Sequence, residues 1–233
     1  MDYITIASAG NAKDFGNMST RKAATAGVDI RNRTVFGGGF TVVTKHNVIE
    51  YVTIASTGNV TDFGDLTVAR TPGHGGMSNQ TRGVFSAGNS STVITLDYIT
   101  IASTGDATDF GDLTMIYASY GGGKGNGHGG IDRSTAFASL PAAIGFHFGG
   151  RTAFPGNSVI TFINIASTSD TTQFGDLTTP RSEGSAIGSS SRALHFGGYT
   201  TSSSNISNII ESVEYSTKGT ASDFGDTSGT SRA

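Results

Sequence analysis

The fold is decided by the stretch Tyr98-Ile99-Thr100-Ile101-Ala102-Ser103-Thr104-Gly105-Asp106-Ala107-Thr108-Asp109-Phe110-Gly111-Asp112-Leu113-Thr114. Versions of this stretch occur five times and span the chain. The marker Phe of each copy lies 48, 47, 64 and 50 residues from the next, at Phe15, Phe63, Phe110, Phe174 and Phe224. The chain is therefore a repeat array, and a period of roughly 40–50 residues is typical of β-propellers.

The quoted stretch predicts a β-hairpin. Residues 98–103 are rich in β-branched and aromatic side chains and alternate in character, which is typical of a strand. Residues 103–106 are turn formers, and residues 107–110 predict a second short strand that ends at Gly111.

A second pair of strands is predicted upstream of this hairpin in each repeat. An apolar run that ends in glycines, such as Arg33-Thr34-Val35-Phe36-Gly37-Gly38, predicts one strand. A run of small residues opened by an Arg, such as residues 21–33, precedes it and has room for another. Four short strands per repeat make one propeller blade, so the sequence predicts an all-β propeller of four to five blades in a single domain, residues 1–233.

The order of these segments resembles the kelch repeat, although the kelch Trp is absent and the Phe of Asp-Phe-Gly takes its place. The wording of the quoted stretch is similar to the repeat in virion structural and tail-fibre-like proteins of marine tailed cyanophages. The resemblance covers nearly the whole chain. It implies a kelch-like propeller in a bacteriophage virion, assembled in the host cytoplasm and then carried on the extracellular particle.

Composition argues against several kinds of partner. The net charge is −3 and no run of Lys or Arg marks a basic face, so we expect no nucleic-acid partner. No basic segment followed by a long apolar one opens the chain, and no run of about 18 apolar residues occurs, so we expect neither a secretory signal nor membrane insertion. The absence of Cys excludes disulfides and thiolate metal sites.

The phase of the repeats leaves one hairpin unmatched. Residues 2–20 carry only the second hairpin of a unit, and complete units follow at 21–67, 70–114, 115–178 and 181–227. An isolated hairpin with an open edge is marginally stable and invites pairing. We expect it to pack beside the final blade, near Val213 to Phe224, or to complete a sheet on a neighbouring subunit of a homo-oligomer. A four-bladed ring with an added hairpin, a five-bladed ring with one thin blade, and strands supplied by a partner all stay open.

The third repeat carries an insertion of about 16 residues between Thr114 and Phe148. We expect an exposed loop over residues 117–133, because Gly-rich insertions on a rigid scaffold commonly carry recognition. Tyr side chains offer stacking area and polar side chains offer hydrogen bonds, so the candidate ligand contacts are Tyr117, Tyr120, Lys124, Asn126 and His128, with His74 from the similar Gly-His-Gly-Gly of the preceding repeat. The alternative is a plain connector lengthened by drift.

Other motifs give no support for catalysis or for a cofactor. Asp-Phe-Gly occurs in protein kinases, but here it lies inside β repeats without a kinase catalytic loop. We instead expect Phe to fill the space between blades, Gly to permit the turn and Asp to cap backbone donors. The acids around Asp109 do not match a calcium loop, and two loop His lack a third metal ligand. His147 and His195 lie within strands, where we expect packing or a hydrogen bond near the axis.

Three functions follow from these observations. The first is a non-enzymatic adhesion module that presents propeller loops to a host-surface glycan or protein. The second is a purely structural component that docks other virion proteins. The third, a glycan-active enzyme, needs two carboxylates roughly 5–10 Å apart across one cleft, whereas the acids here are mostly turn residues.

Overall fold

The computed structural model describes residues 1–72, 75–86, 88, 93–114, 122–125, 143–151, 154–189, 191–202 and 204–230. Every regular secondary-structure element in this part of the chain is a β-strand. They form four antiparallel sheets of four strands each and one two-stranded hairpin. Every four-stranded sheet is a meander of consecutive strands, which is the form of a propeller blade, so the predicted all-β propeller is confirmed with four blades.

The strands follow the chain in order. The N-terminal hairpin contains β1 (Asp2–Tyr3) and β2 (Lys13–Asp14). Blade 1 contains β3 (Ala26–Ile30), β4 (Arg33–Gly37), β5 (Val48–Thr53) and β6 (Thr61–Asp65). Blade 2 contains β7 (Gly76–Ser78), β8 (Arg82–Phe85), β9 (Thr95–Thr100) and β10 (Thr108–Asp112). Blade 3 contains β11 (Gly122–Gly125), β12 (Ile144–Phe148), β13 (Asn157–Asn164) and β14 (Thr172–Arg181), and blade 4 contains β15 (Ser185–Gly188), β16 (Arg192–Phe196), β17 (Ile209–Glu214) and β18 (Ser222–Asp226).

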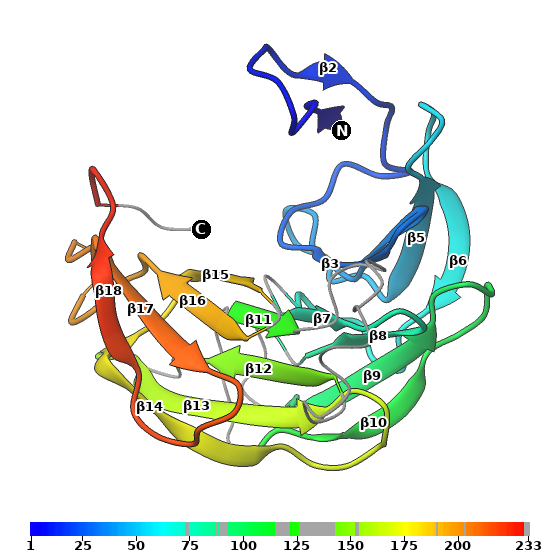
Figure 1. Cartoon of the computed structure of the whole chain (residues 1–233). Helices are drawn as coiled ribbons and strands as arrows, with labels where there is room; N and C mark the ends of the chain where they lie inside the picture. Colours follow the sequence, from blue (N-terminus) through cyan, green and yellow to red (C-terminus); the bar gives the residue numbers. More distant parts are fainter. Residues whose placement is uncertain are drawn as a thin grey trace.

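The blades stand side by side in an open arc (Figure 1). The N-terminal hairpin lies at one end of the arc beside blade 1, and β18 lies at the other end. The expected packing of this hairpin beside the final blade is wrong. Gly58 N donates to Phe15 O (2.7 Å) and Val60 N donates to Asn17 O (3.0 Å), so the hairpin occupies the place of a blade that precedes blade 1. Completion of a sheet on a neighbouring subunit stays a prediction.

The hydrophobic core lies between the blades. Three clusters each join two neighbouring blades: Val35 and Phe63 with Ile99 and Ile101, Leu96 and Phe110 with Ile163 and Ile165, and Phe146 and Phe174 with Val213 and Tyr215. The expected burial of the marker Phe is confirmed for these three blades, where 2–6% of the side chain is exposed at Phe110, Phe63 and Phe174. It is wrong for Phe224, which is 52% exposed because no blade packs on that face in the structure.

Related hydrogen bonds join neighbouring blades, and the one that Ala107 N donates to Asp65 O has an equivalent at every pair. At the junction of blades 1 and 2, Gly105 N donates to Phe63 O (2.7 Å) and Ala107 N donates to Asp65 O (2.8 Å). Asp65 N in turn donates to Asp106 Oδ1 (3.0 Å). Equivalent bonds are Asn17 N to Asn59 Oδ1, Asp112 N to Asp170 Oδ1, Thr171 N to Asp112 O and Ala221 N to Asp176 O. We call this set of contacts, from the outer strand of one blade to the last turn of the next, the junction.

The Gly of Asp-Phe-Gly is required at the junction for two reasons. Gly64 has φ +147°, a conformation that is essentially restricted to glycine. A Cβ on Gly64 would also lie 2.4 Å from the carbonyl oxygen of Gly105 in the next blade. The predicted cap by the preceding Asp is confirmed, because Gly111 N donates to Asp109 Oδ1 (3.1 Å). Asp-Phe-Gly therefore allows the backbone of the outer strand of one blade to contact the backbone of the last turn of the next blade.

Candidate functional site

The candidate contacts from the sequence fall mostly outside the described residues: Tyr117, Tyr120, Asn126, His128 and His74. Lys124 lies in β11, where its Cα pairs with that of Phe146. The described residues therefore do not test whether these six residues lie together.

The prediction of one exposed loop over residues 117–133 is wrong at residues 122–125. These residues form the inner strand of blade 3, in register from Gly122 opposite Phe148 to Gly125 opposite Gly145. Three of the four residues of this strand are glycines, which have low strand propensity, so the sequence pattern did not predict a strand here. Strand β11 contacts β7 and β15, the inner strands of both neighbouring blades, and glycine suits such a close approach of backbones.

Strand β11 divides the predicted loop into two segments. Residues 115–121 join it at Gly122, and residues 126–142 leave it at Gly125, at the opposite end of a strand roughly 13 Å long. Only residues 79–81 separate β7 from β8, whereas residues 126–143 separate β11 from β12. The insertion of the third repeat therefore lies between β11 and β12.

One end of the blades carries connections that differ from blade to blade. In a meander, the loop between the second and third strands lies at the same end as the connector to the next blade. Backbone hydrogen bonds join the two, as from Gly39 N to Arg70 O (3.0 Å) and from Gly150 N to Arg181 O (3.0 Å). We call this end the loop face, and its described residues include 38–47, 66–72, 149–151, 154–156, 182–184, 197–202 and 204–208.

Two blades contribute a charged and aromatic cluster to the loop face. Arg151 Nη2 lies 2.7 Å from Glu183 Oε1, and its guanidinium lies 3.9 Å from the centre of the Phe154 ring. Phe154 in turn makes an edge contact with Tyr199, with ring centres 6.2 Å apart. Phe154 is exposed and Tyr199 is buried. The Arg151 cluster thus presents an aromatic surface on a fixed base.

The corresponding loop of blade 1 has an apolar tip. Val42 and Val43 are 95% and 92% exposed at this tip. A hydrogen bond from Thr41 N to Thr44 O (2.9 Å) closes the loop around them. The loop face therefore differs in chemistry between blades, while the junctions beneath it are alike.

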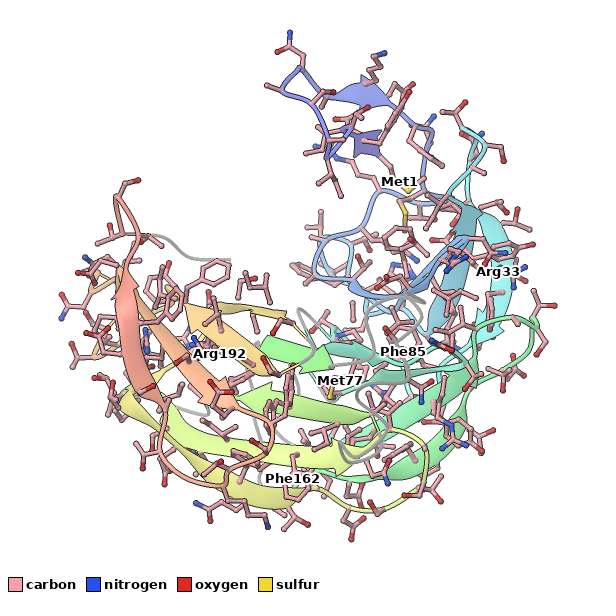
Figure 2. All side chains as sticks on the ribbon, viewed as in Figure 1. Met1, Arg33, Met77, Phe85, Phe162 and Arg192 are labelled. Carbon is pink, nitrogen blue, oxygen red and sulfur yellow. The ribbon has the colours of Figure 1, made fainter. Side chains whose placement is uncertain are left out.

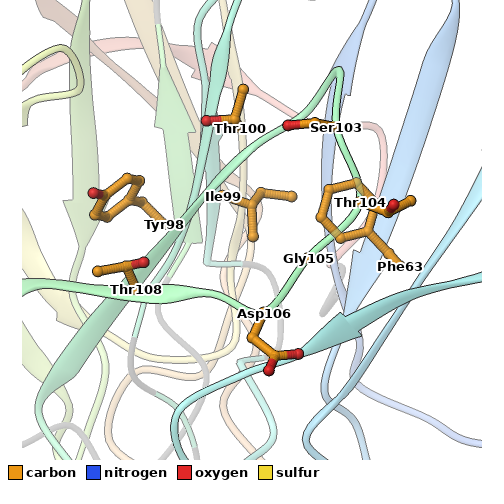
Figure 3. A pocket seen from close by; sticks show the side chains of 9 residues that line it. All are labelled: Phe63, Tyr98, Ile99, Thr100, Ser103, Thr104, Gly105, Asp106 and Thr108. Carbon is orange, nitrogen blue, oxygen red and sulfur yellow. The ribbon is translucent and has the colours of Figure 1, made fainter.

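A pocket of about 250 Å³ lies on the last hairpin of blade 2 (Figure 3). Phe63 of blade 1 forms one side of it, and the other lining residues include Tyr98, Thr100, Ser103 and Asp106. A second pocket of about 300 Å³ is lined by Thr5, Ser8, Gly10 and neighbouring residues of the N-terminal hairpin, at the same positions of the repeat. Because it recurs with the repeat, this hollow is a product of blade construction and is weak evidence for a specific site.

Three buried ion pairs were missed by sequence reasoning. Lys22 Nζ lies 2.8 Å from Glu50 Oε2, Arg70 Nη2 lies 2.9 Å from Asp97 Oδ2, and Arg181 pairs with Glu211. Each acid also accepts a backbone hydrogen bond from the preceding unit, at Ser19, Thr67 and Thr178 respectively. Burial raises the pKa of Glu50, but hydrogen bonds from Lys22 and Ser19 hold that pKa below its ordinary value.

A sequence signal for these pairs does exist. The basic residue stands seven positions after a marker Phe, and the acid stands at a fixed position in the third strand. In the third repeat the two positions hold Tyr117 and Thr161, so base and acid are replaced together. The coordinated loss indicates that the pair is one structural unit.

Two histidines are buried in the second strands of blades 3 and 4. Burial lowers the pKa of His147 to about 4, against a smaller opposing effect of a backbone hydrogen bond at Gly149. Burial, aided by the charges of Arg181 and His147, lowers the pKa of His195 to about 3. The His195 ring stacks on Phe148 with centres 5.4 Å apart. The predicted packing role of these strand histidines is confirmed.

Within the described residues, no group of three or more His, Asp or Glu side chains could hold a metal ion. No helix there is long and apolar enough to cross a membrane. No protein-family model matches the sequence, and no curated protein matches it. What the structure establishes for this chain is therefore its architecture, a β-propeller with four blades in an open arc.

Proposed function

We propose that the chain is a non-enzymatic recognition module that presents its loop face to a glycan or protein on a host surface. The observation that carries this proposal is the contrast between constant junctions and variable loops. The junction contacts recur from blade to blade, whereas blade 1 exposes Val42 and Val43 and blade 3 exposes Phe154. A rigid scaffold with diverse loops on one face is the usual arrangement of recognition proteins.

The Arg151 cluster supports a glycan or a polar protein surface as the ligand. An exposed aromatic ring offers a flat apolar area, and guanidinium and carboxylate groups beside it offer donors and acceptors. The ion pair with Glu183 fixes the orientation of Arg151 before a ligand arrives, which lowers the entropic cost of binding.

The absence of an enzymatic role is part of the proposal. The buried carboxylates of Glu50, Asp97 and Glu211 each face a Lys or Arg, so these three acids are structural ion-pair partners inside the blades. A carboxyl group that serves as a general acid needs a raised pKa, and the pKa of Glu50 is lowered. The virion setting, with other virion proteins as partners, rests on the wording of the repeats alone.

A glycan array and a host-cell binding assay with the labelled full chain test this proposal. We expect Phe154→Ala to reduce binding at least tenfold and the pair Val42→Ser with Val43→Ser to reduce it if the ligand spans blade 1. Ile54→Ser is the matched control, because Ile54 is an exposed apolar residue at the opposite end of blade 1. Equal binding by all folded variants would exclude the described loop face.

The six candidates from the sequence need separate variants, because β11 divides them. Replacing residues 126–142 with the short turn Asn79-Gln80-Thr81 of blade 2 removes His128 and spares β11, but it places an Asn again at position 126. Asn126→Ser tests that residue. Tyr117→Ser with Tyr120→Ser, Lys124→Ser and His74→Ser test the others. Lost binding in the first variant alone would move the site to the end of the blades opposite the loop face. The purely structural alternative predicts no host ligand for any of these chains.

A further inference from the structure

The two ends of the arc expose the two halves of one junction. At the β18 end, Phe224 and Ile187 are 52% and 51% exposed, and with Arg192 and Leu194 they line an apolar pocket of about 210 Å³. The equivalent residues of blade 1 face blade 2; they are Phe63, Val28, Arg33 and Val35. Ile99 and Ile101 of blade 2 pack against the three apolar side chains of this set.

The N-terminal hairpin exposes the complementary half. Ile4 and Ile6 hold the repeat positions of Ile99 and Ile101, yet Ile6 is 95% exposed where Ile101 is fully buried. The turn that follows, Ser8-Ala9-Gly10-Asn11-Ala12, holds the positions that donate and accept the junction hydrogen bonds in blade 2. The hairpin therefore carries an unused copy of the surface that blade 2 presents to blade 1.

We propose that copies of this chain associate head to tail, with the N-terminal hairpin of one copy docked on the open face of blade 4 of another. Ile4 and Ile6 fill the pocket beside Phe224. By equivalence with the other junctions, Gly10 N donates to Phe224 O, Ala12 N donates to Asp226 O, and Asp226 N donates to Asn11 Oδ1. Arg192 donates to Ile6 O, as Arg33 does to Ile101 O (2.9 Å) and Arg82 does to Ile165 O (3.1 Å).

A second copy fits this surface better than the chain's own hairpin. The hairpin is fixed to blade 1 by Gly58 N to Phe15 O and by Val60 N to Asn17 O, and Figures 1 and 2 show it separated from β18 by the opening of the arc. To reach its own blade 4, it would have to bend every junction, and each junction has backbone in contact at a glycine such as Gly64. Docking of a second copy requires no bending of these junctions. Such a contact joins different surfaces on the two copies, so it adds copies in a row or closes a larger ring.

Sedimentation velocity on complementary variants tests the proposal. The wild-type chain is expected to increase in mean mass with concentration, whereas Ile6→Asp and Phe224→Asp are each expected to stay monomeric. An equimolar mixture of these two variants is expected to form dimers and nothing larger, because each keeps one competent end. Ile54→Asp is the matched control, since Ile54 is also an exposed apolar residue but lies in the last turn of blade 1, and it is expected to behave as wild type. Circular dichroism of each variant confirms that it is folded.

Cross-linking separates a second copy from closure by the same chain. The chain has no Cys, so Asn11→Cys in one copy and Asp226→Cys in another give a clean disulfide readout. We expect a covalent dimer from the mixed single variants. A monomer with an internal disulfide in the double variant would show ring closure within one chain and overturn the proposal, as would a wild-type mass that stays monomeric at every concentration.

Discussion

At the scale of single residues, glycine determines whether two blades meet. Gly64 and Gly225 hold the same position in blades 1 and 4 and have nearly the same φ, +147° and +141°. A Cβ on Gly64 would collide with the Gly105 carbonyl, whereas a Cβ on Gly225 meets nothing within 4 Å. Gly64 needs to be glycine for its φ and for its contact with the next blade, whereas Gly225 needs to be glycine for its φ alone.

Substitution by Ala at these two positions makes this separation measurable. Both variants lose roughly 1–3 kcal/mol of unfolding free energy, because Ala is strained at this φ. Gly64→Ala loses more, since it also pushes the next blade away, and the difference appears in urea midpoints at equal slope. Equal losses at the two positions would show that the junction contact contributes no stability.

The buried histidines predict a pH effect of known sign. The pKa of each is lower in the folded chain than the ordinary 6.5, at about 4 for His147 and about 3 for His195. The unfolded chain then binds more protons between these values, so the unfolding free energy falls as the pH is lowered below 6.5. We expect a slope of about 1.4 kcal/mol per pH unit for each His between about pH 4.5 and 6.

Replacement of the histidines provides the control for this pH effect. The folded pKa of Glu50 lies below 4.5, so the stability that this carboxylate contributes is lost only below that value. The double variant His147→Gln with His195→Gln is expected to flatten the slope above pH 4.5 while leaving the loss at lower pH unchanged. Chemical denaturation at a series of pH values measures both.

At the scale of elements, the buried ion pair of blades 1, 2 and 4 acts as a unit. Arg70→Tyr leaves Asp97 buried without its cation, and loss of one partner of a buried pair costs about 3–5 kcal/mol. The third repeat shows the alternative, with Tyr117 and Thr161 at these positions. The double variant Arg70→Tyr with Asp97→Thr is therefore expected to recover part of that loss in a double-mutant cycle. An additive result would mean that the two side chains are not coupled.

Much of each element was readable from the sequence, and the failures have physical causes. The hairpin of the quoted stretch was predicted because β-branched alternation and turn formers are local signals, although its first strand spans Thr95–Thr100 and not residues 98–103. Strand β11 was missed because glycine has low strand propensity. Its glycines are explained by the close approach of β7 and β15 on its two sides, which the sequence does not show. The buried ion pairs were missed because each joins residues about 30 positions apart, such as Lys22 and Glu50, whose approach depends on the fold.

At the scale of the whole molecule, the arc is a one-dimensional stack in which each blade contacts its neighbours. Sequence phase predicted an unmatched hairpin, but its location beside blade 1 followed from junction geometry that a period alone does not contain. The exposure of Phe224 has the same origin, since burial of a repeat residue depends on which blade comes next.

Deletion of residues 1–18 tests the nearest-neighbour view. The hairpin contacts blade 1, and no core cluster includes it, so we expect the remaining arc to stay folded with a small loss of stability. Deletion from residue 182 onward removes blade 4 and exposes Phe146 and Phe174, so it is expected to lower the melting temperature much further. Circular dichroism melts of the two truncated chains make the comparison. Loss of all structure in the first deletion would show that the hairpin holds the arc together.

The identity of the junctions has a consequence for the gene that encodes this chain. Each junction uses the same repeat positions, so an unequal crossover that inserts or removes one whole unit of about 48 codons leaves every surviving junction with its own donors and acceptors. Such a crossover changes the length of the arc and the set of loops that it carries without creating a new surface to be optimised. Variation in repeat number is thus an inheritable route to arcs that carry new sets of loops.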